Sequence, residues 1–93
     1  MKSTVIDTGE RFIIDHQGQE SYLSYRLQGQ VLDFYNAFVP GPLRGKGYAK
    51  DLILYGMHYA VRNGLRVQPS HPAVVRFIQL NREWEYLSVS KLN

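Results

Sequence analysis

Hydrophobic residues in the first third of the chain recur at every second position, in two segments at residues 20–28 and 31–39 that follow a short apolar run at 11–15. A period of two is typical of strands that bury one face. In the first of these segments, one face carries Leu23, Tyr25 and Leu27. In the second, one face carries Leu32, Phe34, Asn36 and Phe38. Short glycine-containing turns join the segments, so the pattern predicts a three-stranded antiparallel meander.

The spacing of apolar residues changes after the Pro-Gly-Pro sequence at 40–42, which ends the third strand because proline cannot donate to a strand ladder. Between residues 48 and 63, apolar positions recur at spacings of three and four: Ala49, Leu52, Ile53, Gly56, Met57, Ala60 and Val61. This stripe predicts an amphipathic helix with Gly64 as its C-cap. A short strand at 65–68 and a second helix from Pro72 follow. The strand–helix–strand order predicts a right-handed crossover between parallel neighbours.

These elements predict one α+β domain over residues 1–93, with a mixed sheet and two helices. The alternation from Trp84 to Val89 predicts one further, short edge strand. A length of 93 residues excludes large folds such as a TIM barrel or a two-half doubly wound sheet. The composition, with 44% hydrophobic and 20% charged residues, is that of a globular chain.

Composition also limits the kinds of site and of partner that we expect. The absence of cysteine excludes disulfides, thiolate zinc sites and a cysteine nucleophile, and the three histidines lack metal-ligand spacing, so we expect no metal. Small secreted domains usually rely on disulfides, and no apolar run approaches the ~20 residues that cross a bilayer. We therefore expect a cytoplasmic protein with no membrane contact. The net charge of +3 suits an anionic ligand, whereas nucleic acid usually requires a clustered basic patch and is the weakest partner hypothesis.

The informative segment lies between the third strand and the first helix, where the glycine-rich basic loop comprises Arg44, Gly45, Lys46 and Gly47 and the helix begins with Tyr48 and Ala49. The first amides of a helix have no intrahelical partner, and the helix dipole adds positive potential there. With flexible glycines and two cations, such a loop is a cradle for phosphate. The spacing fits neither a P-loop nor a dinucleotide fingerprint.

The pattern Arg44-x-x-Gly47-x-Ala49 resembles the acetyl-CoA-binding motif of the GNAT acetyltransferases. Together with the Pro-Ser-His-Pro sequence at 69–72 and the short length, it is similar to a small GNAT-like family of about 90–100 residues with a minimal GNAT core. The likeness covers about residues 11–87.

This resemblance implies that the pantetheine arm of CoA pairs with the strand backbone at Phe38 and Val39. It also implies that the pyrophosphate lies on the loop amides from Arg44 to Ala49, and that the thioester points toward the strand end near Ser70. The implied reaction is direct acetyl transfer from acetyl-CoA to an amine. The chain lacks room for the two helices that usually wall the acceptor site, so we expect an acceptor site open to a protein or other large substrate, or completed by a partner.

Three positions depart from that family's pattern. His71 stands where cysteine is usual, Asn36-Ala37 stands where His-Thr is frequent, and the second helix lacks a tyrosine acid at 77–79. His71 is our candidate general base; the alternative is that it only caps the second helix. A non-catalytic CoA-binding module or accessory protein is therefore the competing functional hypothesis.

Overall fold

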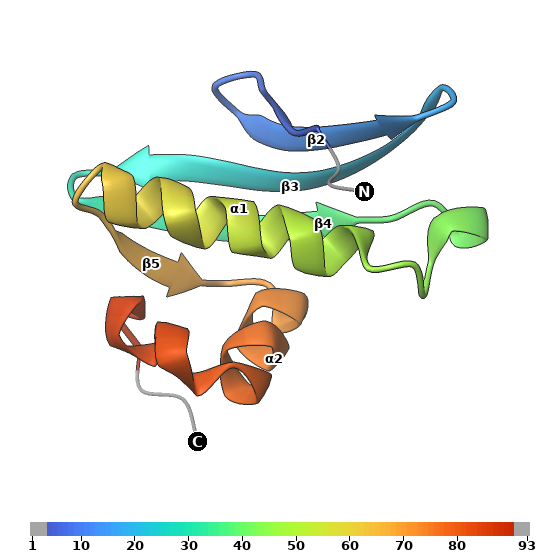
Figure 1. The fold of residues 1–93 in the computed structure, drawn as a ribbon. Coiled ribbons are helices and arrows are strands. Elements are labelled where there is room, and N and C mark those ends of the chain that lie inside the picture. The colour runs from blue at the N-terminus through green and yellow to red at the C-terminus, as the bar shows by residue number, and fades with distance from the viewer. Residues whose placement is uncertain (1–3, 91–93) are drawn as a thin grey trace.

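Four strands precede the first α-helix in the computed structural model, which describes residues 4–90. The elements are β1 (Ile6–Asp7), β2 (Arg11–His16), β3 (Gln19–Gln28), β4 (Val31–Phe38), the 3₁₀ helix η1 (Gly41–Leu43), α1 (Tyr48–Arg62), β5 (Arg66–Pro69), α2 (Pro72–Leu80) and the 3₁₀ helix η2 (Arg82–Leu87). The five strands form one sheet in the order β1-β2-β3-β4-β5 (Figure 1). The first four strands pair antiparallel, and β5 lies parallel to β4. The expected α+β class with a mixed sheet is confirmed, and β1 adds a strand that the sequence pattern did not indicate.

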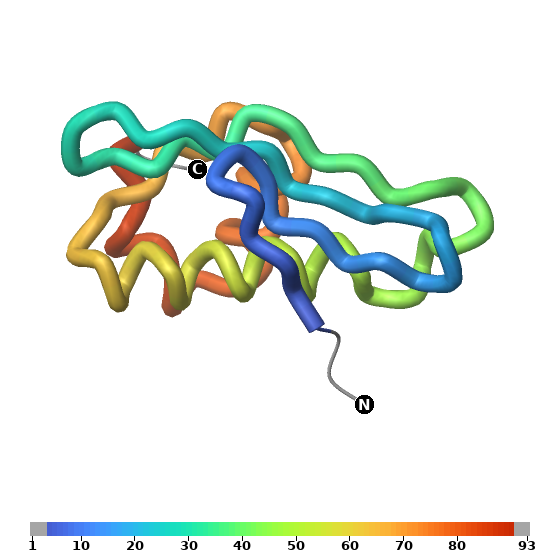
Figure 2. The backbone as a smooth tube through the Cα atoms, turned by 90° about the horizontal axis from the view of Figure 1, so that it is seen from above, coloured from blue at the N-terminus to red at the C-terminus, as the bar shows by residue number. Residues whose placement is uncertain are grey.

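Helix α1 packs on one face of the sheet and builds the core there. Figure 2 shows α1 on one side of β3 and β4. The fully buried side chains of this layer come from strands and helices alike: Phe12, Leu23, Leu32, Phe34, Leu52, Met57, Val67, Val74 and Ile78. The helix approaches closely at Gly56, where an added Cβ would stand 2.6 Å from the ring of Phe34. Glycine is therefore required for the observed distance between α1 and β4.

A β-bulge changes which residues of β4 face this core. Opposite Ser24 and Tyr25 the register of β4 shifts, and Tyr35 is the extra residue. Beyond the bulge, Phe38 pairs with Tyr22 and lies on the sheet face opposite α1, 43% exposed. The expectation that Asn36 and Phe38 share one face with Phe34 is thus wrong, because one inserted residue reverses the facing of every residue after it. Leu27 pairs with Leu32 on the expected face, and it is 59% exposed because it lies near the end of β3.

The expected edge strand near the C-terminus is wrong as well. Residues 82–87 form η2, and only a single parallel bridge, from Val67 to Ser88, joins this segment to the sheet. Trp84 and Leu87 are three residues apart, which places both on one side of a 3₁₀ turn. Arg66 fixes the segment, since its Nη2 donates to the carbonyl of Ser88 at 2.7 Å. Within residues 4–90, neither α-helix combines the length and apolar composition needed to cross a bilayer.

Candidate functional site

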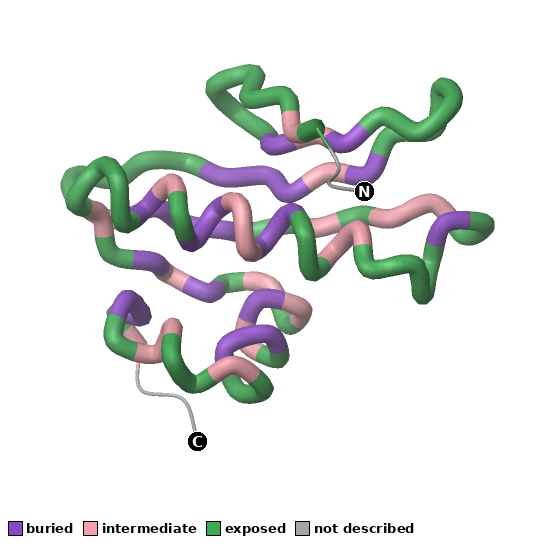
Figure 3. The backbone as a smooth tube through the Cα atoms, in the orientation of Figure 1, coloured by how far each residue is buried: buried purple, intermediate pink, exposed green. Residues whose placement is uncertain are grey.

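The loop between β4 and α1 lies at an exposed edge of the fold, and the amide of its first residue, Arg44, donates to the carbonyl of Gly41 at 3.2 Å. Leu43 is buried and anchors η1, whereas residues 44–47 are exposed (Figure 3). Gly45 and Gly47 have φ values of 79° and 88°, which L-residues with side chains rarely adopt. Gly47 is the N-cap of α1 and provides no side-chain cap to the first helical amides. The loop therefore directs uncapped N–H groups and the positive end of α1 toward solvent.

Basic side chains surround these amides. Arg44 and Lys50 line a depression of about 290 Å³ at the start of α1, together with Gly45, Gly47, Tyr48 and Ala49. The Nε of Arg44 donates to the carbonyl of Val39 at 3.1 Å. A guanidinium has five N–H donors, so four remain for a ligand. This contact places Arg44 between the end of β4 and the start of α1. These are the two parts of the expected CoA site.

The pairing of β4 with β5 ends halfway along β4. The last paired residues are Phe34 and Pro69, and the amides of Ser70 and His71 both donate to the carbonyl of Phe34 at 3.1 Å. From there β5 turns away into α2, while β4 continues to Phe38 with β3 as its neighbour. Among residues 4–90, the edge of β4 beyond Phe34 consequently has no strand partner on the β5 side. Such an edge can pair with an extended ligand that carries amide groups.

His71 caps α2. Its Nδ1 accepts a hydrogen bond from the amide of Ala73 at 3.1 Å, and Pro72 occupies the first helical position. In a neutral imidazole, one nitrogen accepts while the other carries the proton. Nε2 of His71 is therefore the N–H donor. His71 therefore caps α2, and its Nδ1 is engaged in that cap. Its role in catalysis stays a prediction.

Ser70, beside His71, has a buried partner that sequence analysis missed, Asp33. The hydroxyl of Ser70 donates to Oδ1 of Asp33 at 2.6 Å, across 37 residues of chain. Arg26 binds the other carboxylate oxygen, with Nε 3.2 Å from Oδ2. Asp33 is 6% exposed, although aspartate is rarely buried without partners. An acidic residue between the apolar residues Leu32 and Phe34 was the available signal.

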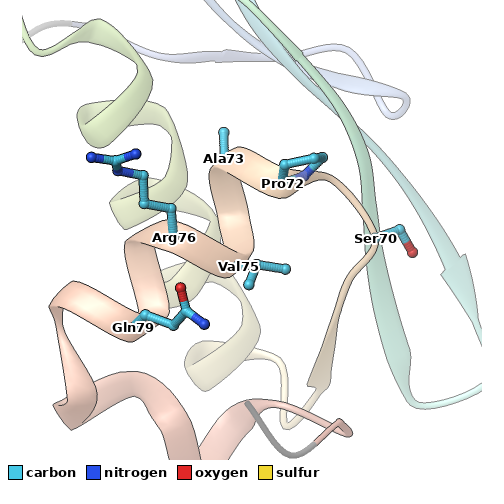
Figure 4. A pocket seen from close by; sticks show the side chains of 6 residues that line it. All are labelled: Ser70, Pro72, Ala73, Val75, Arg76 and Gln79. Atoms are coloured by element: carbon cyan, nitrogen blue, oxygen red, sulfur yellow. The ribbon is translucent and has the colours of Figure 1, made fainter. Parts of the chain in front are cut away.

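An open pocket begins at Ser70 and continues along α2. It has a volume of about 530 Å³ and is lined by Ser70, Pro72, Ala73, Val75, Arg76 and Gln79. In Figure 4 the side chain of Ser70 points away from those of Arg76 and Gln79. Ser70 therefore lies at the border between this pocket and β4.

Aromatic side chains of α1 contribute to packing. The rings of Tyr55 and Tyr59 contact Phe12, at centroid distances of 5.0 and 5.3 Å. His58 contacts the edge of Trp84 at 5.0 Å. Among residues 4–90, no cluster of three or more histidine, aspartate or glutamate side chains has a geometry that holds a metal ion.

The comparison with protein families decides the affiliation. The model of the family described as GCN5-related N-acetyl-transferase matches residues 11–87. The chain belongs to the GCN5-related N-acetyl-transferase family. A search of curated proteins found no match. The matched range runs from β2 through η2. The basic loop, the divergence of β4 and β5 and the Asp33–Ser70 pair all lie within it. Members of the family generally use acetyl-CoA.

Proposed function

We propose that this protein is an acetyl-CoA-dependent N-acetyltransferase that transfers the acetyl group directly to an amine. The observation that carries the proposal is the continuity of two features: the uncapped, basic start of α1 and the unpaired edge of β4. The first suits a pyrophosphate and the second suits an amide-containing pantetheine arm. Their junction at Val39 and Arg44 matches the order of these groups in CoA.

Each part of CoA then has protein groups that fit it. The backbone of Phe38 and Val39 would pair with pantetheine, and the amides of residues 45–49 would hold the pyrophosphate, since the amide of Arg44 already donates to the carbonyl of Gly41 at 3.2 Å. Arg44 and Lys46 would supply charge-assisted contacts to phosphate oxygens. The thioester would then lie near Ser70 and His71, where β5 leaves β4.

His71 has a donor role in this proposal. When an amine attacks the thioester, the carbon–sulfur bond breaks and the sulfur leaves with an electron pair. Nε2–H of His71 can donate to that sulfur, while Nδ1 stays engaged by the amide of Ala73. A protonated group near the departing thiolate lowers the barrier to its release.

The amine acceptor would approach the sheet face opposite α1. In the described part of the chain α1 contacts β2 to β5 on one face, and α2 lies against β5, α1 and η2. The opposite face exposes aromatic side chains, including Tyr35 and Phe38, at 41% and 43%. We propose that this open face admits a large acceptor, such as the amine of a protein, rather than enclosing a small one.

The proposal is tested by titrating acetyl-CoA into the protein in a calorimeter, then measuring free thiol after incubation with acetyl-CoA and a panel of polyamines, lysine peptides and proteins. We expect saturable binding and amine-dependent thiol release. Absence of binding at millimolar acetyl-CoA would refute the proposal. Binding without thiol release for any amine would favour the second candidate, a CoA-binding module, which the occupied Nδ1 of His71 and the absence of a tyrosine at 77–79 support.

A further inference from the structure

We propose that Ser70, oriented by Asp33, accepts the proton that the acceptor amine loses during acetyl transfer. This inference rests on the proposed acetyltransferase function and assigns the proton acceptor that His71 does not supply. Ser70 is the first residue after β5, at the point where β5 leaves β4. A thioester that follows the free edge of β4 would end beside it.

Asp33 is fixed from two sides. Its Oδ1 accepts from the Ser70 hydroxyl at 2.6 Å, and its Oδ2 accepts from Nε of Arg26 at 3.2 Å. The guanidinium of Arg26 in turn stands 4.4 Å from the centre of the Tyr35 ring. Only 8% of the Asp33 side chain is exposed, so bulk water scarcely competes for the carboxylate. The bond to Ser70 is therefore well oriented and short, as charge-assisted O–H···O bonds are.

The direction of this hydrogen bond sets what Ser70 can offer a ligand. A hydroxyl has one proton and two lone pairs. Because the proton of Ser70 points to Asp33, the exposed side of Oγ presents lone pairs. Ser70 can then accept a hydrogen bond from an N–H group but cannot donate one. His71, the next residue, presents the opposite polarity through Nε2–H.

The two residues together balance the transfer. The neutral amine nitrogen attacks the thioester carbon and forms the new carbon–nitrogen bond. As that nitrogen becomes cationic, its proton passes to Oγ of Ser70, while the Ser70 proton passes to Oδ1 of Asp33. The carbon–sulfur bond breaks, and the sulfur leaves as a thiolate that accepts a hydrogen bond from Nε2–H of His71. The thiolate then takes a proton from water, and Asp33 returns its proton to water through Ser70. The net products are an amide and free CoA.

Ser70 would thus be a catalytic residue, and Asp33 a positioning residue that acts through it. Arg26 would hold Asp33 in place. A structural role of the Ser70–Asp33 bond would instead change stability and leave the pH dependence of turnover as it is. This difference makes the two roles separable by experiment.

The test compares Ser70→Ala, Ser70→Thr and Asp33→Asn in the full chain, using the amine that gives the fastest thiol release in the panel. Ser88→Ala is the matched control, because Ser88 also donates through its hydroxyl but to the carbonyl of Ser90, on the C-terminal segment. We expect Ser70→Ala to lower kcat about 100-fold at neutral pH, the usual range for loss of a proton-transfer group, with KM for acetyl-CoA within about twofold. Ser70→Thr, which keeps the hydroxyl, should retain most of kcat.

The pH profile gives the decisive readout. The difference in kcat between the parent and Ser70→Ala should shrink from about pH 7 to about pH 9.5, because hydroxide can replace the missing proton acceptor. Asp33→Asn should show the same narrowing, and the double variant should be no slower than either single one, since the two residues act as a unit. Thermal unfolding of each variant shows whether Asp33→Asn still folds. If it does not, Ser70→Ala alone carries the test, because Ser70 is exposed and its substitution should leave the fold intact.

Three outcomes overturn the inference: kcat of Ser70→Ala within about threefold of the parent, a deficit that is constant with pH, or an acetylated Ser70 seen by intact mass after incubation with acetyl-CoA. The last would mean covalent rather than direct transfer. If the parent protein itself binds no acetyl-CoA, the proposed function fails first. If the parent is active and Ser70→Ala is equally active, the proton route alone is wrong.

Discussion

The loop before α1 and the end of β5 form the two regions of the proposed site, and they differ in how the fold builds them. The loop is local: residues 44–49 are contiguous, and their donors arise from two glycines and the start of one helix. The end of β5 is assembled from distant segments, because Ser70 meets Asp33 across 37 residues and Arg26 comes from a third strand. Local construction gives binding groups that depend little on the rest of the fold. Long-range construction gives a proton route that depends on strand register.

Phe34 lies between α1 and the end of β5, and removing its side chain should have the largest effect. Its ring is fully buried under Gly56 of α1, and its carbonyl holds the amides of Ser70 and His71. We expect Phe34→Ala to lower the free energy of unfolding by about 3–5 kcal/mol, the usual loss for a buried phenylalanine. Urea unfolding followed by circular dichroism measures this. A loss below about 1 kcal/mol would contradict the packing of this ring under α1 as a main contribution to stability.

The local region should lose ligand affinity without loss of stability. Arg44→Ala removes a charge-assisted phosphate contact, so we expect acetyl-CoA affinity to fall about 10- to 100-fold while the melting temperature stays nearly constant. Arg62→Ala is the matched control, because Arg62 is an exposed arginine at the opposite end of α1. Calorimetric titration of both variants gives the comparison. Equal affinities in the two variants would contradict the position of the pyrophosphate.

At the end of β5, His71 combines a structural and a chemical role that two substitutions separate. His71→Asn keeps an N-cap acceptor for α2 but removes Nε2–H, whereas His71→Ala removes both. We expect both variants to lower kcat by about tenfold or more, and only His71→Ala to lose about 1 kcal/mol of stability. Steady-state kinetics beside thermal unfolding provides the test. Normal turnover of His71→Asn would leave His71 with the cap alone.

The smallest effect at neutral pH belongs to a contact outside both regions. Tyr25 donates to Oδ1 of Asp7 at 2.5 Å, and burial, followed by this bond, raises the pKa of its phenol above the ordinary value. Unfolded chains ionise at about pH 10 while the folded phenol stays protonated, so its stabilisation is present below that pH and is lost as pH rises further. Tyr25→Phe should cost about 1 kcal/mol at pH 7 and show a shallower alkaline decline. The urea midpoints of the parent and of Tyr25→Phe should converge as the pH rises above about 10. A difference between the two midpoints that stays constant with pH would contradict the contribution of Tyr25.

The difference between the local loop and the end of β5 explains which parts of the fold and of the site could be predicted from the sequence. Residues 44–49 and the helix of α1 follow from glycine, charge and a stripe of period 3.6, all readable along the chain. The Ser70–Asp33 pair depends on the parallel register of β4 and β5, which no local pattern specifies. The facing of Phe38 depends on one extra residue, Tyr35, in a bulge that a strict period of two cannot anticipate. The nitrogen of His71 that carries the proton is set by the hydrogen bond from the Ala73 amide to Nδ1, which the sequence does not specify.

Nuclear magnetic resonance of ¹⁵N-labelled protein titrated with acetyl-CoA tests the central claim most directly. The free amides at the start of α1 and the unpaired edge of β4 are the groups that would bind the ligand. The account predicts that the largest amide shifts occur at residues 44–49 and at Phe38 and Val39, with smaller shifts at Ser70 and His71. Shifts confined to other elements, or none at millimolar acetyl-CoA, would contradict it.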